Sequence, residues 1–261
     1  MKIDYEKCIE CKNCVYVCPS TAIEYSDGKI VVSNPGYCIK CMHCACICPA
    51  EAISFEGAEA YDVCKRVQMQ GITKENLKNF IKSCRSIRNY RNEIVSRAEI
   101  EEVINMLPWS ASAKNEHSLK AVVVSGRSNA DRIFEMVVEY TQREKLFPEI
   151  IRQKDRGNNI VMGDAINLMF ICGDIRANNP MADAVVAASN ARMMFETMGI
   201  GSCFSGYLMS IADNIPQLIE FLKIPEGNKI YAVLLFGYKE RETYDKVPYR
   251  PEMETIWIER E

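Results

Sequence analysis

Cysteine has the densest and most regular spacing of any residue in this sequence. Nine of the 13 cysteines in the 261 residues lie between positions 8 and 48. The pattern C-x2-C-x2-C-x3-C-P occupies residues 8–19 and recurs 30 positions later at residues 38–49, and the Ala-Ile pair at residues 22–23 recurs at residues 52–53. The pattern is therefore an internal duplication. Thiolates at this density in a reducing compartment favour metal or redox chemistry over disulfides.

The duplicated spacing resembles that of two-cluster bacterial ferredoxins, and the resemblance covers residues 1–57. In that pattern three closely spaced thiolates hold one [4Fe-4S] cluster, while the fourth cysteine of each copy ligates the other cluster. The resemblance therefore implies two [4Fe-4S] clusters with crossed ligand sets. One set is Cys8, Cys11, Cys14 and Cys48, and the other is Cys38, Cys41, Cys44 and Cys18.

Zinc and disulfides are the alternative interpretations of these cysteines. Zinc sites also use C-x2-C pairs, but zinc closes a tetrahedron with four ligands and gives no reason for a third cysteine followed by x3-C-P. Disulfides need an oxidising compartment, which nothing in the sequence indicates. Cys46 falls between two ligand positions and, like His43, is interpreted as a residue that packs beside a cluster.

The overall composition is that of an ordinary folded, mildly acidic protein. With 48% hydrophobic residues, 26% charged residues and a net charge of −3, it gives no indication of a nucleic acid or an anionic membrane as partner. No apolar run approaches the roughly 18 residues of a membrane span, and the start MKIDYEKC lacks the apolar region of a secretory signal. We expect a cytoplasmic protein.

After residue 57 the cysteine density falls and helical patterns begin. Residues 58–82 are predicted to form a helical connector, in which Thr73 caps a helix from Lys74 to about Lys82. Residues 83–261 have about the length of one domain. In this part Ser96 and Glu99 have capping-box spacing ahead of an amphipathic helix.

Further patterns in the second part mix strands with helices. Short apolar runs predict buried strands at residues 121–125, 166–172 and 230–237. Residues 182–202 predict a long, largely buried helix that ends at Gly199 and Gly201. The predicted fold class is α+β.

A cationic corner at residues 84–88 could hold an anionic ligand. Arg85 and Arg88 flank Ser86 there, and guanidinium and hydroxyl groups suit a phosphate or an anionic ring edge. Taken alone, the segment is more typical of a solvated basic patch that includes Lys82 and Arg91.

Four short segments in order change that interpretation. RSIRNY, SASAKNEH, GIGSCFSG and a late YRP resemble the nitroreductase family of FMN proteins over about residues 83–258. The first family motif usually reads Arg-Arg-Ser-x-Arg, so Arg85, Ser86 and Arg88 match, whereas Cys84 replaces the leading arginine. The second is commonly Pro-Ser-x-x-Asn-x-Gln-Pro and is matched at two positions, Ser112 and Asn115; it departs at Ala111, His117 and Ser118.

The resemblance implies a set of FMN contacts. Arg85, Ser86 and Arg250 would hold phosphate and ribityl, and Arg88 would approach N1 and O2, where charge gathers on reduction. Ser112 and Asn115 would reach the cofactor from a second subunit, and Ser205 and Gly206 would line its far side through their backbone. Further candidates are Asn158 for the pyrimidine edge and Lys246 as a substitute for the missing arginine. His117 could face the flavin, but an ordinary structural role is favoured for it.

The two resemblances together imply a small duplicated ferredoxin domain followed by an α+β flavin domain that works as a homodimer with FMN at the interface. Clusters pass single electrons and reduced FMN can deliver two, so the expected function is reduction of a small organic acceptor, nitroaromatic or quinone-like. A reduced ferredoxin-like protein is the favoured donor and NAD(P)H the other. The alternatives are an electron-transfer module that serves a protein partner, and specialised flavin chemistry such as reductive dehalogenation or flavin cleavage.

Overall fold

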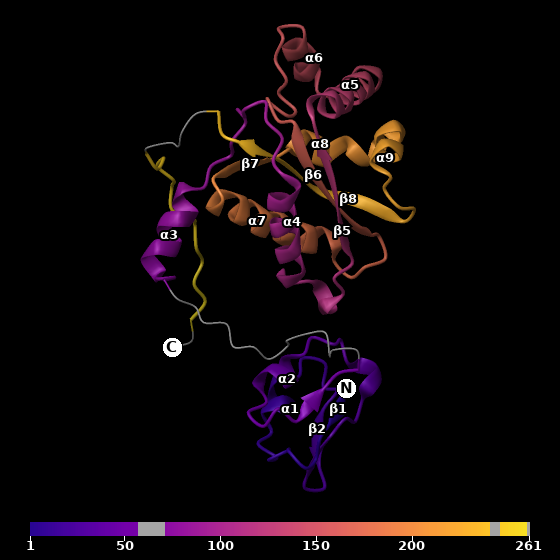
Figure 1. Ribbon diagram of the computed structural model, residues 1–261, viewed down its shortest axis with the longest axis vertical. Helices are drawn as coiled ribbons and strands as arrows, with labels where there is room; N and C mark the ends of the chain where they lie inside the picture. Colours follow the sequence, from indigo (N-terminus) through magenta and orange to yellow (C-terminus); the bar gives the residue numbers. More distant parts are fainter. Residues whose placement is uncertain (57–70, 241–245, 260–261) are drawn as a thin grey trace. The chain divides into compact units, whose positions relative to one another are not determined.

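The computed structural model describes residues 1–56, 71–240 and 246–259, and the chain forms two compact units. The first unit contains the N-terminal residues up to Gly71 together with residues 111–117 and 177–179. The second contains residues 72–110, 118–176 and the chain from Pro180 onward. Figure 1 labels the elements of both units. Helices and strands both occur, so the α+β class is confirmed.

The first unit repeats one small motif twice. Helix α1 (Asn13–Val17) and helix α2 (His43–Ile47) lie 30 positions apart, as the cysteine pattern does. Short strands complete the unit: β1 (Lys2–Ile3) pairs antiparallel with β4 (Ile53–Ser54), and β2 (Glu24–Ser26) pairs antiparallel with β3 (Lys29–Val31). A 3-10 turn, η1 (Pro35–Tyr37), precedes the second copy. The small core includes Ile23, Ile30 and Ile53.

The duplication extends to the backbone dihedral angles. Three pairs of non-glycine residues adopt the left-handed conformation at the same places in both copies, with φ between 49° and 63°. The pairs are Glu10 and Lys40, Lys12 and Met42, and Thr21 and Glu51. Left-handed residues in succession with right-handed ones turn backbone N–H groups toward a common point, which is how loops surround anionic sulfur and phosphate groups.

The second unit is built on one antiparallel sheet with the strand order β5-β6-β8-β7. Strands β5 (Leu119–Ser125), β6 (Asn167–Asp174) and β8 (Asn228–Tyr238) confirm the three predicted strands. The edge strand β7 (Ile200–Phe204) was not predicted. The prediction that Gly201 helps to end the preceding helix is wrong, because Gly201 lies inside β7 and pairs with Gly237.

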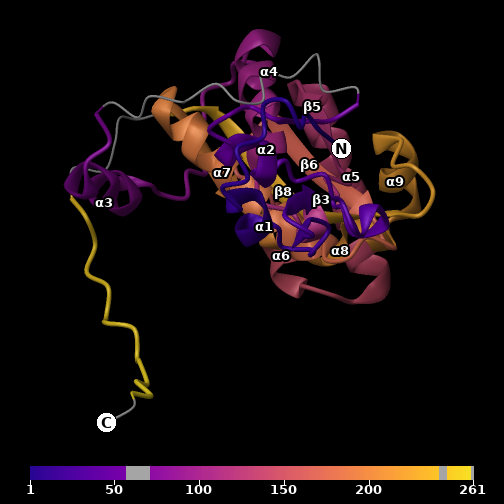
Figure 2. The same cartoon turned by 90° about the horizontal axis from the view of Figure 1, so that it is seen from below.

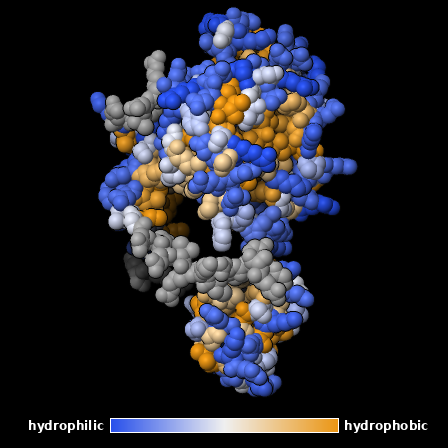
Figure 3. Space-filling view, viewed as in Figure 1, coloured by the Kyte–Doolittle hydropathy of each residue, from blue (hydrophilic) through white to orange (hydrophobic). Residues whose placement is uncertain are grey.

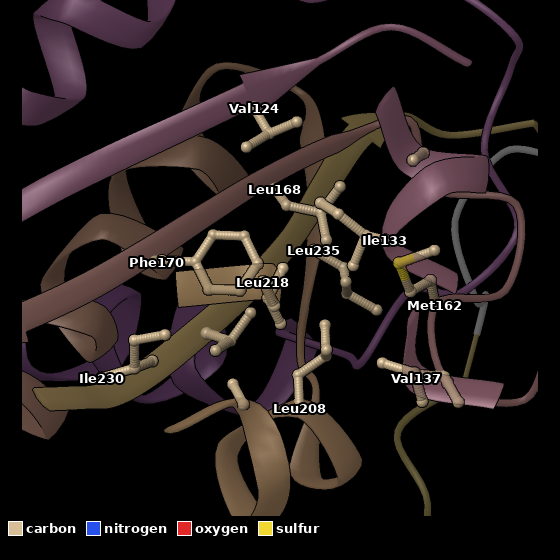
Figure 4. Close-up of a cluster of buried hydrophobic side chains, with 14 of the residues drawn as sticks. Val124, Ile133, Val137, Met162, Leu168, Phe170, Leu208, Leu218, Ile230 and Leu235 are labelled. Carbon is tan, nitrogen blue, oxygen red and sulfur yellow. The ribbon is translucent and has the colours of Figure 1, made fainter. Parts of the chain in front are cut away.

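Helices cover both faces of this sheet (Figure 1, Figure 2). Side chains alternate along a strand, so Leu168 and Phe170 of β6 face one layer while Met169 and Ile171 face the other. The first layer comprises α5 (Arg127–Glu144), α6 (Pro148–Lys154), α8 (Gly206–Ile211), η5 (Ala212–Asn214) and α9 (Pro216–Leu222). Figure 4 shows apolar side chains from strands and helices meeting in this layer.

The opposite face carries α4 (Arg97–Met106), which leads into η3 (Leu107–Trp109), and α7 (Pro180–Thr197). The predicted capping box is present at the start of α4, where Ser96 accepts from the Glu99 backbone and the Glu99 carboxylate accepts from the Ser96 N–H. The predicted connector helix is α3 (Lys74–Ser83), and Thr73 Oγ1 accepts from the Asn76 N–H at 3.1 Å. Residues 58–70 of the predicted connector lie outside the described residues.

Helix α7 is buried on one face, so the prediction of a largely buried helix is only partly right. Ala184, Ala188 and Phe195 are buried against the sheet, but Val185 and Val186 are 38% and 40% exposed. Sequence alone could not separate the two faces, because alanine, valine and methionine occupy both. Figure 3 shows that apolar side chains interrupt the hydrophilic surface of this unit.

Candidate functional site

The eight cysteines of the duplicated pattern surround two cavities in the first unit. Each cavity combines three cysteines of one copy with the fourth cysteine of the other. Cys8, Cys11, Cys14 and Cys48 line one cavity. Cys18, Cys38, Cys41 and Cys44 line the other. These are the crossed sets that the resemblance to ferredoxins implies, so the donor set fits two polynuclear clusters.

The thiols at the centre of each set are the most buried. Burial raises the pKa of Cys14, and it raises the pKa of Cys44 to about 11. A buried thiol of this kind becomes a thiolate ligand when a metal supplies the compensating positive charge. In the described ranges no group of three or more His, Cys, Asp or Glu side chains could hold a single metal ion. The cysteines are instead arranged around cavities.

Backbone donors also point at the fourth cysteine of each copy. The Ala22 N–H donates to Cys18 Sγ at 3.3 Å, and the Ala52 N–H donates to Cys48 Sγ at 3.3 Å. Burial raises the pKa of Cys18, but hydrogen bonds from Ala22 and Ser20 outweigh it, so the pKa lies below its ordinary value. N–H donors to ligand sulfurs are part of how proteins set cluster potentials.

In the second unit the cationic segment is an extended chain laid along the sheet. The Ile87 N–H donates to the Ser202 carbonyl at 3.0 Å, and the Arg91 N–H donates to the Tyr238 carbonyl at 2.9 Å. The Arg88 carbonyl accepts from the Asp164 N–H at 3.1 Å. The backbone of this segment is therefore held from β7, β8 and the loop before β6.

Glycines on three elements make room for this segment. A Cβ at Gly163 would lie 2.2 Å from the Arg88 carbonyl oxygen, and one at Gly201 would lie 2.8 Å from the Ile87 side chain. A Cβ at Gly237 would lie 3.0 Å from the Tyr90 ring. Only glycine permits such close approach of backbone to backbone at Gly163, whose φ is +58°. The backbone at Arg88 therefore packs directly against Gly163, and the neighbouring Ile87 packs against Gly201 in the edge strand β7.

Arg88 opens onto a cavity of about 350 Å³ inside the second unit. Its volume is in the range of small-molecule and cofactor sites. Among its lining residues are three of the proposed cofactor contacts, Arg88, Ser205 and Gly206. Ser205 Oγ donates to the Val161 carbonyl at 2.9 Å and caps α8, and the Ser205 N–H donates to the Val233 carbonyl at 3.0 Å, so both groups hold the cavity wall in place.

An aromatic pair forms another part of the cavity wall. Phe147 and Tyr207 meet edge to face with ring centroids 5.3 Å apart, and Tyr207 Oη donates to the Glu149 carboxylate at 3.1 Å. Burial and that hydrogen bond raise the pKa of Tyr207. Sequence reasoning did not identify either ring, because no local pattern brings residue 147 beside residue 207.

The other predicted contacts have different surroundings. The Arg85 guanidinium donates to the carbonyls of Cys84 and Lys82, and Ser86 is exposed. Asn158 Nδ2 donates to Gln153 Oε1 at 2.9 Å. Arg250 is exposed and donates to the Tyr249 carbonyl at 3.2 Å.

Ser112 and Asn115 belong to the first unit, in and beside the turn η4 (Ala113–Asn115). Ser112 Oγ accepts from the His117 N–H at 3.3 Å, and Asn115 Oδ1 lies 2.9 Å from His117 Nε2. His117 thus has a role in shaping this turn.

A charged cluster beside Cys84 was also missed. Lys239 and Glu196 form an ion pair at 2.7 Å with side chains that are 13% and 15% exposed. Burial, then Glu196, raises the pKa of Cys84, whereas Arg192, Lys239 and Arg85 act in the opposite direction. Cations therefore approach the position where the family motif would have its leading arginine. Lys239, which directly follows β8, is one of these cations, and its charge is paired with Glu196.

The fold and the site define an α+β protein with a duplicated cysteine unit and a cofactor-sized cavity beside an anchored arginine. The nitroreductase family model matches residues 81–238, and the chain belongs to this family. Residues 1–49 match the 4Fe-4S dicluster domain. Both resemblances found in the sequence are thereby confirmed. No curated protein matches the chain.

Solved structures show the same fold for the second part of the chain. A nitroreductase with bound FMN from Bacteroides fragilis NCTC 9343 has 18% identity, covers 70% of this chain and 100% of its own, and has a TM-score of 0.57. A nitroreductase with bound FMN from Desulfitobacterium hafniense DCB-2 has 18% identity, coverage of 69% and 96%, and a TM-score of 0.57. An FMN-dependent nitroreductase from Clostridium difficile R20291 has 19% identity, coverage of 70% and 100%, and a TM-score of 0.53.

None of the described helices is both long and apolar enough to span a membrane.

Proposed function

We propose that this protein is an FMN-dependent oxidoreductase in which electrons from two [4Fe-4S] clusters reach FMN and reduce a small organic acceptor, nitroaromatic or quinone-like, by two electrons. The observation that carries the proposal is the presence, in one chain, of two cavities each lined by four cysteines and a cavity lined by Arg88. Nitroreductase family membership and the FMN-bound fold neighbours support the flavin. When bound, clusters supply single electrons and FMN supplies two-electron chemistry.

The chain's own residues bind and orient the cofactor. Arg88 would supply a permanent cation where negative charge gathers on the ring, and its backbone is held at the edge of the cavity. Ser205 and Gly206 line the cavity beside it, and the rings of Phe147 and Tyr207 would face the cofactor from another part of the wall. Arg85, Ser86 and Arg250 are proposed for phosphate and ribityl. Lys239 and Arg192 lie near Cys84 and are proposed, in preference to Lys246, as the cations that replace the missing arginine.

A homodimer with FMN at the subunit interface is part of the proposal. Ser112 and Asn115 would reach the cofactor from the second copy. The partly exposed apolar face of α7, with Val185 and Val186, supports a protein partner at that surface. The cytoplasmic location belongs to the proposal too, as does the division into a ferredoxin domain (1–57), a connector (58–82) and a flavin domain (83–261).

The favoured electron donor is a reduced ferredoxin-like protein, and NAD(P)H is the alternative. The reason is that clusters attached to a reductase supplied directly by NAD(P)H would have no evident use in substrate reduction. Two other functions stay open as outcomes of the test. One is an electron-transfer module for a protein partner, and the other is specialised flavin chemistry such as reductive dehalogenation.

One anaerobic preparation tests the proposal. We expect about eight iron and eight sulfide per chain, FMN on extraction, and reoxidation of the reduced flavin by a nitroaromatic or a quinone. Zinc, or about two iron atoms per chain, would contradict the clusters, and FAD or the absence of flavin would contradict the cofactor. A reduced flavin that no small acceptor reoxidises would favour the electron-transfer module.

Two cysteine variants two positions apart sharpen the test of the ligand sets. Cys48→Ser is expected to disturb the cluster held by Cys8, Cys11 and Cys14, because Cys48 lines that cavity. Cys46→Ser is the matched control, since Cys46 is exposed in α2, the helix that Cys48 caps. Equal loss of iron in both variants would overturn the crossed assignment.

A further inference from the structure

The two copies of the duplicated unit present their fourth cysteine in nearly identical backbone settings. Cys18 has φ −74° and ψ 107°, and Cys48 has φ −71° and ψ 110°. Each sulfur accepts a hydrogen bond at 3.3 Å from the N–H four residues later, and each cysteine is half-buried. The backbone angles and the N–H donor are therefore closely similar at the two sulfurs.

One side chain distinguishes these two settings. Ser20 Oγ lies 3.8 Å from Cys18 Sγ, and the residue at the same place in the second copy is Ala50. Ser20 and Ala50 are both half-buried, so the difference between them is the hydroxyl and not the exposure. A thiolate that ligates iron has no proton to give, and the hydroxyl must therefore be the donor in this contact.

We propose that the Ser20 hydroxyl raises the reduction potential of the cluster held by Cys18, Cys38, Cys41 and Cys44, so that the two clusters are inequivalent. The inference rests on the two clusters of the proposed function. Reduction adds one electron and one negative charge to the cluster and its thiolates, and a donor to a ligand sulfur stabilises the more negative form. Ala50 offers no such donor to Cys48.

Two further side chains, Lys12 and Met1, also differ between the surroundings of the two cysteine sets, but neither donates a hydrogen bond to Cys18 or Cys48 in the described contacts. Lys12 lines the cavity of the first set, but its ammonium group lies over the Tyr25 ring, 3.7 Å from the centroid, and is exposed to solvent and salt. Met1 Sδ lies 3.7 Å from Cys44 Sγ and offers no proton. Neither contact changes when Ser20 is replaced, so the hydroxyl can be tested separately.

The test is a potentiometric titration of the full chain without oxygen, with dithionite as reductant and electron paramagnetic resonance as readout. Because 3.8 Å is long for this hydrogen bond, we expect a modest effect of Ser20→Ala. At a fixed potential the ratio of reduced to oxidised cluster should fall roughly threefold for one cluster, which corresponds to about 30 mV for one electron. The other cluster should not shift.

The duplication supplies a reciprocal variant. Ala50→Ser should raise the potential of the cluster held by Cys8, Cys11, Cys14 and Cys48, and Ser20→Thr should keep the wild-type values because the hydroxyl is retained. Unchanged potentials in both Ser20→Ala and Ala50→Ser, or equal shifts of both clusters in either one, would overturn the inference. A wild-type protein that contains no iron or sulfide would instead overturn the proposed function. If the Ser20→Ala variant does not assemble its clusters, the potentials measured for the Ala50→Ser variant test the inference alone.

Discussion

Replacing Gly163 by alanine should cost the second unit several times more stability than the same replacement at Gly157. Both glycines lie in the loop before β6 and both have positive φ, +58° and +80°. At Gly157 a Cβ meets nothing within 4 Å, so the cost is the strain of an L-residue in that conformation, about 1 kcal/mol. At Gly163 the Cβ would lie 2.2 Å from the Arg88 carbonyl oxygen.

A backbone oxygen cannot swing away as a side chain can, so Arg88 must move with it. The movement adds a packing cost of about 1–3 kcal/mol and weakens the Asp164-to-Arg88 hydrogen bond, worth about 1 kcal/mol. The total for Gly163→Ala is then about 3–5 kcal/mol. Since Arg88 lines the cavity, this variant should also retain less FMN, whereas Gly157→Ala should retain it.

Urea titration of the full chain without oxygen, followed by far-ultraviolet circular dichroism, gives the two stabilities because most helical residues lie in the second unit. Flavin content after gel filtration gives the second readout. Equal destabilisation by both variants would mean that the close approach of Gly163 to Arg88 does not fix the site. Normal FMN content in Gly163→Ala would mean that the position of Arg88 is unimportant for the cofactor.

Three further predictions concern the cofactor, pH and iron. Arg88→Ala should weaken FMN binding at least tenfold by equilibrium dialysis and leave cluster absorbance unchanged, with the exposed Arg91→Ala as control; loss of both chromophores would contradict independent sites. Burial raises the pKa of Asp213, so wild-type stability should fall as pH rises from the ordinary carboxyl value through the raised one, while Asp213→Asn escapes this loss; parallel melting curves against pH would contradict it. Removing iron with a chelator should unfold the first unit and leave the second folded, as amide hydrogen exchange would show.

Local patterns predicted those features that local sequence determines. The spacing of the cysteines, the capping box at Ser96 and the apolar runs of β5, β6 and β8 were all visible because each is contiguous. Gly201 was misplaced because its reason for being glycine is Ile87, more than a hundred residues away. The pair Lys239 and Glu196 and the rings of Phe147 and Tyr207 were missed for the same reason.

The left-handed residues explain why iron and folding should be coupled in the first unit. Six non-glycine residues, three in each copy, adopt the left-handed conformation, which costs roughly 1–2 kcal/mol per residue. The buried core that opposes this strain is small and includes Cys14 and Cys44, which are themselves proposed ligands. Strain of this kind persists when the surroundings over-determine it. Bonds from eight thiolates to two clusters would do so, and the left-handed turns would in return direct backbone N–H groups at the sulfurs. Since both copies share this backbone, differences between the two proposed clusters would come from side chains such as Ser20, which is why a single hydroxyl can matter there.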